Sequence, residues 1–172
     1  INASDFDPIK NIDTQLNRLF PVNKCDSIVD IVRIAATAKD IPLAIDLSRL
    51  IADKGYDVCI NLMKITCISR EEIATISKEI KKSAANVFYI ADSLGSLNRD
   101  KLLDITDAIR TSWEGSIGIH AHNNQSMALS NMLFAYGLGY DWLDVTVDGM
   151  GRGPGNAATE EAIVELSYNN KT

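Results

Sequence analysis

Two histidines, His120 and His122, are the residues of this chain whose type and spacing point most directly to chemistry. They are the only histidines in the sequence, they lie one residue apart, and two carboxamides, Asn123 and Asn124, follow them. Because side chains alternate between the faces of a β-strand, the two imidazoles can converge on one ion. Neutral imidazole is the commonest metal ligand in proteins. The alternative interpretation is a polar strand end that faces solvent.

A glycine-rich segment, residues 149–156 (GMGRGPGN), is the second candidate. Alternate glycines permit backbone angles that other residues avoid and allow close approach to a ligand. The segment lacks the Gly-Lys-Ser/Thr of a P-loop, and it follows the last predicted strand, where a Rossmann fingerprint would open a βαβ unit. A structural loop in which Asn156 caps the next helix is the alternative.

Composition bounds the class of protein. A chain of 172 residues with 46% hydrophobic residues is long and apolar enough for one ordinary domain. The net charge of −6 argues against a nucleic-acid partner, which would require a basic patch. No apolar run approaches the roughly 20 residues needed to span a bilayer, and the start lacks a signal-peptide pattern, so we expect a cytoplasmic protein without a membrane partner. The three cysteines, Cys25, Cys59 and Cys67, are expected to be reduced, mostly buried thiols.

The elements that must position these residues read as an α/β fold. Short runs rich in β-branched residues alternate with segments of helical period, which is typical of parallel strands alternating with helices. The expected strands are residues 30–35, 57–63, 86–91, 116–121 and 143–147. Ser69 and Glu72 form a capping box at the start of a helix, and Ile73, Ile76 and Ile80 give that helix one apolar stripe. Residues 1–6 read like the end of a strand whose beginning is absent, which is compatible with a fragment.

Two architectures fit this alternation: an open doubly wound sheet and part of a (β/α)8 TIM barrel. A doubly wound sheet concentrates its site at one switch point, whereas the mouth of a barrel collects polar residues from nearly every strand end. The polar residues expected after the strands are Asp5, Lys64, Asp92, His120, His122, Asn124 and Asn156. This distribution favours a partial TIM barrel. We expect residues 1–172 to be a single incomplete catalytic domain of about the last five to six βα units.

Three ordered motifs carry a family resemblance. Residues 89–95 (YIADSLG), 118–124 (GIHAHNN) and 149–157 (GMGRGPGNA) resemble, in order and spacing, the HMGL-like superfamily of TIM-barrel metallolyases. Within it the chain is most similar to the 4-hydroxy-2-oxovalerate aldolases, and residues 30–35 and 61–63 are weaker matches to their fourth and fifth strands. The isopropylmalate synthases and the hydroxymethylglutaryl-CoA lyases share the His-x-His and the Gly-Asn ending.

The resemblance implies roles for individual residues. By matching position, His120, His122 and Asn156 hold a divalent metal, with manganese or magnesium favoured over zinc or cobalt. Asp92 would line the mouth. Apart from the resemblance, Arg33 lies within an apolar strand and is expected to point into the barrel toward a carboxylate; both residues are taken as catalytic. The residues assigned to substrate binding are Asn61, Asn124, Gly151 and Arg152.

The implied reaction is cleavage of a 4-hydroxy-2-oxo acid to pyruvate and an aldehyde. The metal acts as a Lewis acid on the 2-oxo acid as the bond breaks, and a base takes the C4 hydroxyl proton. This chain offers no evident base, and by the resemblance it lacks the family's first two strands. The first of these brings an Arg-Asp pair whose aspartate completes the metal site, so two histidines and an asparagine alone should bind the metal weakly. We therefore expect the isolated chain to be poorly active or inert. A homo-oligomer, or a partner enzyme that receives the aldehyde, is compatible with this chemistry.

Three alternatives remain open. An acyl-CoA-dependent enzyme that condenses a 2-oxo acid uses the same enolate chemistry and the same motifs. A truncated barrel that acts as a non-catalytic interaction domain is the second. In the third, Lys64 near a strand end forms a Schiff base with a ketone, although a solvated lysine is the simpler interpretation.

Overall fold

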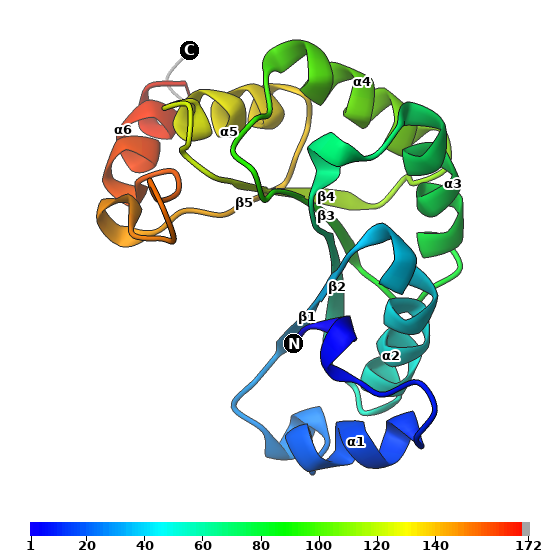
Figure 1. Ribbon diagram of the computed structural model, residues 1–172. Coiled ribbons are helices and arrows are strands. Elements are labelled where there is room, and N and C mark those ends of the chain that lie inside the picture. Colours follow the sequence, from blue (N-terminus) through cyan, green and yellow to red (C-terminus); the bar gives the residue numbers. More distant parts are fainter. Residues whose placement is uncertain (170–172) are drawn as a thin grey trace.

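The computed structural model describes residues 1–169 as βα units around one parallel sheet (Figure 1). The strands are β1 (Ile31–Ala36), β2 (Asp57–Leu62), β3 (Val87–Asp92), β4 (Ser116–Ala121) and β5 (Trp142–Leu143). Neighbouring strands are parallel, and their order across the sheet, β1-β2-β3-β4-β5, is their order along the chain. A doubly wound sheet reverses its strand order at a switch point. The sequential order therefore excludes that alternative and confirms the partial barrel.

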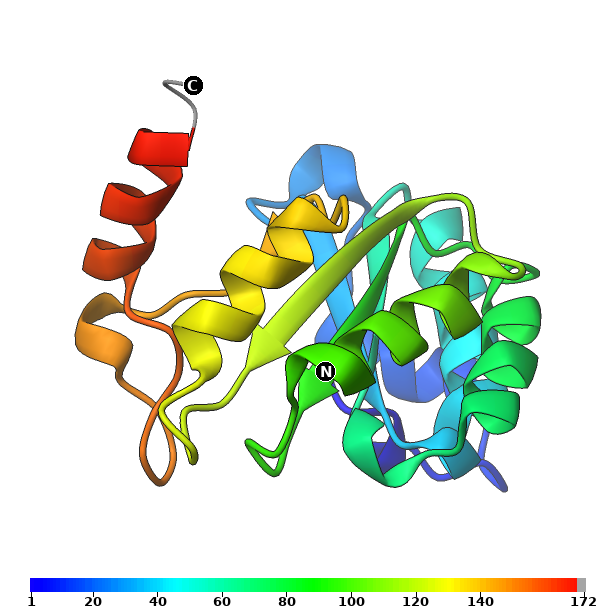
Figure 2. The ribbon, with the colours of Figure 1, turned by 90° about the horizontal axis from the view of Figure 1, so that it is seen from above.

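The described residues form six α-helices. They are α1 (Ile12–Leu19), α2 (Ile41–Asp53), α3 (Arg70–Ile80), α4 (Arg99–Arg110), α5 (Ala128–Gly137) and α6 (Thr159–Asn169). In Figure 1, α2 to α5 follow an arc around the outside of the curved sheet, and Figure 2 shows these two layers from above. We call the side that faces the helices the convex face and the opposite side the concave face. None of the described helices is long and apolar enough to cross a membrane.

Alternation along the strands gives the two faces different chemistry. Val32, Ile34 and Ile60 are buried in the main core, between the convex face and the helices. The intervening positions project from the concave face, and the register brings them into rows: Arg33 pairs with Cys59, Asn61 with Tyr89, and Ala91 with His120. The concave face therefore carries most of the polar residues of the strands.

The predicted helix signals are found in α3. The Ser69 Oγ accepts a hydrogen bond of 3.2 Å from the Glu72 amide, as expected at an N-cap. Ile73, Ile76 and Ile80 are all buried, so the apolar stripe packs α3 against the sheet. This helix was predictable because its start and its buried face both depend on nearby residues.

Two strand predictions need correction. The strand expected at residues 143–147 is only Trp142–Leu143, because the chain turns away and Thr146 instead pairs with the segment before α6. The Thr146 amide donates to the Ala157 carbonyl (3.0 Å). This amide is therefore not available for the hydrogen bond that a longer strand would make in the sheet. At the other edge, the expected strand end at residues 1–6 is a single bridge between Asn2 and Ala35, followed by a 3-10 turn, Ala3–Asp5.

Candidate metal centre

The two histidines end β4 at the carboxyl edge of the sheet. Their ring centroids are 5.1 Å apart and the ring planes are inclined by 78°. Both side chains are partly exposed. An isolated antiparallel bridge joins His122 to Asn156, although they lie 34 positions apart along the chain. The backbone thus brings the third predicted ligand residue beside the histidine pair.

The glycine loop holds Asn156 in place. The Asn123 amide donates to the Gly155 carbonyl (2.8 Å), and the Asn156 amide donates to the Gly149 carbonyl (2.9 Å). Gly155 has a φ of +91°, and a Cβ there would lie 2.1 Å from the Gly149 carbonyl oxygen. A Cβ at Gly151 would lie 2.5 Å from the Asn156 Nδ2. Glycine is therefore required at both positions for the loop to close around the asparagine.

The side chain of Asn156 has one satisfied end and one unsatisfied end. Its Nδ2 donates to the Met150 carbonyl (3.0 Å), which fixes the orientation of the amide. Its Oδ1 is buried and, within residues 1–169, has no hydrogen-bond partner. A buried polar atom without a partner costs about 1–3 kcal/mol. A cation at this oxygen would remove that cost, so Asn156 fits the role of an oxygen ligand.

The donor set available for such a cation is two imidazoles and one amide oxygen. The part of the chain that the structure describes contains no group of three His, Cys, Asp or Glu side chains arranged to hold a metal. His120, His122 and Asn156 carry no negative charge when the histidines are neutral. This set fits a divalent ion in ligand type, but it offers no direct carboxylate to balance the charge.

The structure adds a residue that the sequence analysis missed, Asp144, directly after β5. Its Oδ2 lies 2.9 Å from the His120 Nδ1. Its two oxygens also accept from Arg33, one from the NH1 group and the other from the NH2 group, the second at 2.9 Å. The carboxylate thus lies between a metal-ligand candidate and a guanidinium.

The register of the sheet explains why Asp144 meets His120. Ile119 pairs with Leu143, and the Asp144 amide continues the ladder by donating to the Ile119 carbonyl (3.0 Å). The next positions on the two strands are therefore His120 and Asp144, and both project from the concave face. The strand expected at residues 143–147 would have placed Asp144 inside it, and the sequence did not reveal the register of Asp144 against the histidine strand.

Arg33 is held between Asp144 and an aromatic ring. Its guanidinium carbon lies 3.8 Å from the centroid of the Tyr89 ring. The Tyr89 ring in turn lies over Gly118, where a Cβ would be 2.5 Å from ring carbons. Burial, together with the Asp144 carboxylate, raises the pKa of Tyr89, so its hydroxyl is neutral at neutral pH. Arg33 is consequently fixed in orientation on the concave face.

The electrostatics of the site favour a charged aspartate and a neutral histidine. Burial by itself would raise the pKa of Asp144, but the hydrogen bond to His120 and the ion pair with Arg33 outweigh it and lower the pKa to about 2. Burial and the neighbouring His120 lower the pKa of His122, against the opposing charge of Asp92. Metal ligation requires the neutral form of histidine. At neutral pH His122 therefore has the protonation state that a metal needs.

Comparison with known proteins identifies the family. A sequence profile described as HMGL-like matches residues 13–170, which is nearly the whole chain. The chain belongs to the HMGL-like family. The family resemblance drawn from the three motifs is thereby confirmed.

Two relatives of this HMGL-like chain have names that denote lyases. It is 30% identical over 151 residues to the oxaloacetate decarboxylase of Mycobacterium tuberculosis, covering 88% of this chain and 45% of that protein. It is 31% identical over 142 residues to the 4-hydroxy-2-oxovalerate aldolase of Geobacillus genomosp. 3, covering 83% of this chain and 42% of that protein. The chain thus spans less than half the length of these two relatives.

Solved structures support the fold of this HMGL-like chain. The N-terminal domain of a candidate aldolase from Bacteroides vulgatus matches with a TM-score of 0.85 at 28% identity, covering 100% of this chain and 55% of that one. An HMG-CoA lyase of Bacillus subtilis matches with a TM-score of 0.74 at 16% identity, covering 81% of this chain and 56% of that one. At that lower identity the likeness concerns the fold alone.

Asp92 was predicted to be catalytic. In this HMGL-like chain its carboxylate accepts hydrogen bonds from two backbone amides. One oxygen accepts from the Ser96 amide and the other from the Leu97 amide, both at 3.0 Å. The side chain is 1% exposed. In this structure Asp92 shapes the loop between β3 and α4, and its charge reaches His122 only as a long-range influence.

The four residues assigned to substrate binding do not form one group. Asn61 is buried on the concave face, and its Oδ1 has no hydrogen-bond partner among the described residues. Asn124 is exposed and lies against Gly95, where a Cβ would be 2.3 Å from the Asn124 Oδ1. Gly151 makes room for Asn156, and Arg152 is exposed, with its charge lowering the pKa of His122.

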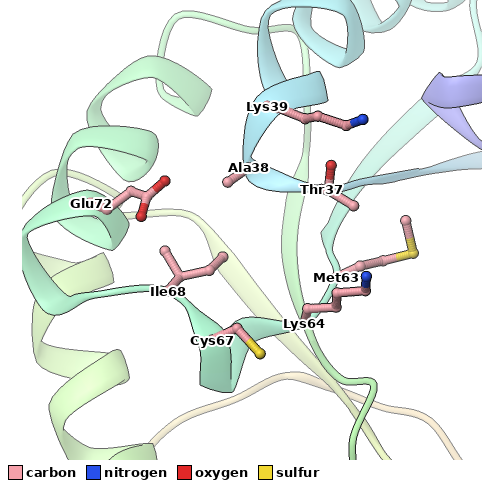
Figure 3. Close-up of a pocket in the computed structure, with 8 residues that line it drawn as sticks. All are labelled: Thr37, Ala38, Lys39, Met63, Lys64, Cys67, Ile68 and Glu72. Carbon is pink, nitrogen blue, oxygen red and sulfur yellow. The ribbon is translucent and has the colours of Figure 1, made fainter.

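Lys64, the rival Schiff-base candidate, lies in a separate cleft of about 410 Å³ (Figure 3). The cleft is lined by Thr37, Ala38, Lys39, Met63, Lys64, Cys67, Ile68 and Glu72. Lys64 has a left-handed φ of 55°, and its amide donates to the Ser93 Oγ (2.9 Å). Its side chain is exposed, and the cleft contains none of the residues predicted for the metal centre.

Proposed function

We propose that the protein to which this chain belongs is a divalent-metal-dependent lyase that cleaves a carbon–carbon bond of a 2-oxo acid and releases pyruvate. The preferred substrate is a 4-hydroxy-2-oxo acid such as 4-hydroxy-2-oxovalerate, which would give an aldehyde as the second product. The observation that carries the proposal is the buried, unpartnered Oδ1 of Asn156, a residue whose backbone pairs with that of His122. The aldolase name of one relative supports the substrate class.

The residues of this chain would divide the work between holding a metal and holding a substrate. His120, His122 and Asn156 would hold manganese or magnesium. When bound, the ion supplies a Lewis acid that draws electron density from a 2-oxo group. Asn61 offers an amide oxygen on the concave face that can accept a hydrogen bond from a substrate hydroxyl.

Proton transfer limits what this chain does alone. Aldol cleavage requires a base that removes the C4 hydroxyl proton. Both histidines are used as ligands in the proposal, Asp92 is engaged by backbone amides, and Tyr89 is neutral at neutral pH. The proposal therefore includes low activity for the isolated chain.

Decarboxylation of oxaloacetate is the second candidate, and the same lack of a base favours it. Loss of carbon dioxide leaves the electron pair on the 2-oxo acid without removal of a hydroxyl proton, so no base is needed at that step. A proton added afterwards gives pyruvate. The oxaloacetate decarboxylase name of another relative supports this candidate.

The test combines metal binding with product analysis. Calorimetry with Mn²⁺ is run on the chain and on the variant with both His120→Ala and His122→Ala, and pyruvate release is followed from 4-hydroxy-2-oxovalerate and from oxaloacetate. We expect weak Mn²⁺ binding that disappears in the double variant, and slow metal-dependent pyruvate release.

The comparison of substrates ranks the candidates. Faster release from 4-hydroxy-2-oxovalerate, with an aldehyde formed in equal amount, supports the aldolase, and faster release from oxaloacetate supports the decarboxylase. Acetyl-CoA consumption with a 2-oxo acid would favour the condensing enzyme instead. Absence of Mn²⁺ binding and of pyruvate from both substrates would contradict the proposal and favour an interaction domain.

A further inference from the structure

The contact between His120 and Asp144 bears on which nitrogen of the imidazole carries the proton. An imidazole has two nitrogens, and the partner of one nitrogen decides which atom carries the proton and which keeps a lone pair. The His120 Nδ1 faces the Asp144 Oδ2 at 2.9 Å. Which nitrogen of His120 keeps a lone pair for a metal therefore depends on whether the Asp144 Oδ2 accepts or donates a hydrogen bond.

Arg33 keeps the Asp144 carboxylate ionised. Both oxygens of the carboxylate accept from the guanidinium of Arg33, and such a two-point pair requires an ionised carboxylate. An ionised carboxylate only accepts hydrogen bonds. The His120 Nδ1 must then be the donor, and the proton of the neutral ring lies on Nδ1.

Arg33 is itself restrained. Its guanidinium stacks on Tyr89 at 3.8 Å, and Tyr89 is 1% exposed and packed over Gly118. The four side chains form a continuous series of contacts on the concave face: Tyr89 contacts Arg33, Arg33 contacts Asp144, and Asp144 contacts His120. Each member limits the orientation of the next one.

We infer that Asp144 is a positioning residue that holds His120 with Nδ1 protonated and Nε2 presented to a metal, and that Arg33 acts on the site by clamping Asp144. The role given to Nε2 rests on the metal centre of the proposed function. The assignment of the proton to Nδ1 rests only on the contacts of His120 and Asp144 and is independent of that proposal. The inference also gives Arg33 a different role from the direct catalytic one expected from the sequence, since its NH1 and NH2 groups are engaged by Asp144.

The tautomer is measurable without any metal. Long-range ¹⁵N–¹H correlation spectra of the metal-free chain distinguish the two neutral forms, and a His122→Gln variant assigns the two rings. We expect His120 to be protonated on Nδ1 in the unsubstituted chain. A predominance of the Nε2–H form would overturn the inference, and this measurement needs no substitution at Asp144.

The Asp144→Asn variant tests the cause. The amide keeps the size of the side chain but lacks the charge that fixes Nδ1 as the donor, so we expect the Nε2–H form of His120 to become populated. The Mn²⁺ affinity should fall by about 10–100-fold, the usual effect of removing the partner of a metal-bound histidine. Asp141→Asn, which neutralises an exposed carboxylate at the opposite end of β5, is the control and should change neither result.

The two proposals fail in different ways. If the unsubstituted chain binds no Mn²⁺, the metal centre of the proposed function is contradicted, and the tautomer still decides the role of Asp144. An unchanged tautomer and an unchanged Mn²⁺ affinity in Asp144→Asn would overturn the inference while leaving the metal centre intact. A loss of stability alone, without a change of tautomer, would assign Asp144 a purely structural role and would also overturn it.

Discussion

Arg33 on β1 and Asp144 directly after β5 form a two-point ion pair, although their strands lie at the opposite edges of the sheet. In a flat sheet, four strand spacings of about 4.8 Å would separate these strands by about 19 Å, too far for the two side chains to meet. The pair forms because the sheet curves like the wall of a barrel. It links the curvature of the fold directly to His120, which contacts the same carboxylate.

Replacement of Arg33 should therefore destabilise the chain more than loss of an ordinary surface ion pair. Arg33→Met leaves the partly buried Asp144 carboxylate without its cation, and we expect the free energy of unfolding to fall by about 1–3 kcal/mol in urea titrations. The control is Arg70→Met, which removes the more exposed pair with Asp104 and should cost no more than about 1 kcal/mol. Equal losses in both variants would argue against a special role for the pair.

Gly118 should not tolerate a side chain. In Gly118→Ala the new Cβ would lie 2.5 Å from carbons of the buried Tyr89 ring, so the ring or the strand must move. We expect a loss of about 1–3 kcal/mol in thermal or urea unfolding, as for other overpacked cores. Gly137→Ala is the matched control, because its Cβ would meet no atom within 4 Å and alanine favours the helix by up to about 1 kcal/mol. A neutral Gly118→Ala variant would contradict the packing of Tyr89 against β4.

Asn156 should control metal affinity through its Oδ1. Asn156→Ala removes the oxygen and should abolish measurable Mn²⁺ binding, whereas Asn156→Asp supplies the missing negative charge and should tighten binding. Calorimetry on the two variants measures both effects. Asn124→Ala is the control, since the Asn124 side chain lies against Gly95 and should leave the affinity unchanged. An unchanged Mn²⁺ affinity in Asn156→Ala would mean that this side chain is not a ligand.

Stability should fall at high pH because of Tyr140. Its hydroxyl is buried beside the Thr106 Oγ1 (3.0 Å), and burial raises its pKa to about 12. The unfolded chain ionises near pH 10 and the folded chain near pH 12, so the contribution is complete below pH 10 and is lost as the pH rises to about 12. The loss is on the order of 3 kcal/mol. Unfolding curves of Tyr140→Phe should lack this part of the slope, and a slope equal to that of the unsubstituted chain would refute the assignment.

Lys64 should not form a Schiff base. Lysines that do so are activated in an apolar pocket or beside another cation, whereas the Lys64 side chain is exposed at the rim of an open cleft. Treatment with pyruvate and borohydride should add no mass to the peptide that contains Lys64, and Lys64→Ala should leave pyruvate release unchanged. Covalent trapping at Lys64 would revive the rival chemistry.

The family and the fold class were accessible from the sequence because both depend on local patterns. The strand at residues 116–121 was predicted with its observed bounds, since period-two alternation and its polar end are written in consecutive residues. The three motifs also contain their own spacing, and the family profile agrees with them. The strand expected at residues 143–147 was too long, because Thr146 pairs with a segment more than ten residues away.

The sequence by itself determined the strand at residues 116–121 with its histidine end, and it marked the glycine-rich loop, because these features follow from side-chain alternation and from the lack of a Cβ. Only the tertiary structure decided that Asp144 meets His120 and Arg33, that backbone amides engage Asp92, and that the Asn156 Oδ1 is left without a partner among the described residues. Those facts depend on strand register, on sheet curvature and on loop closure. These properties arise from contacts between distant parts of the chain, and no local pattern encodes them.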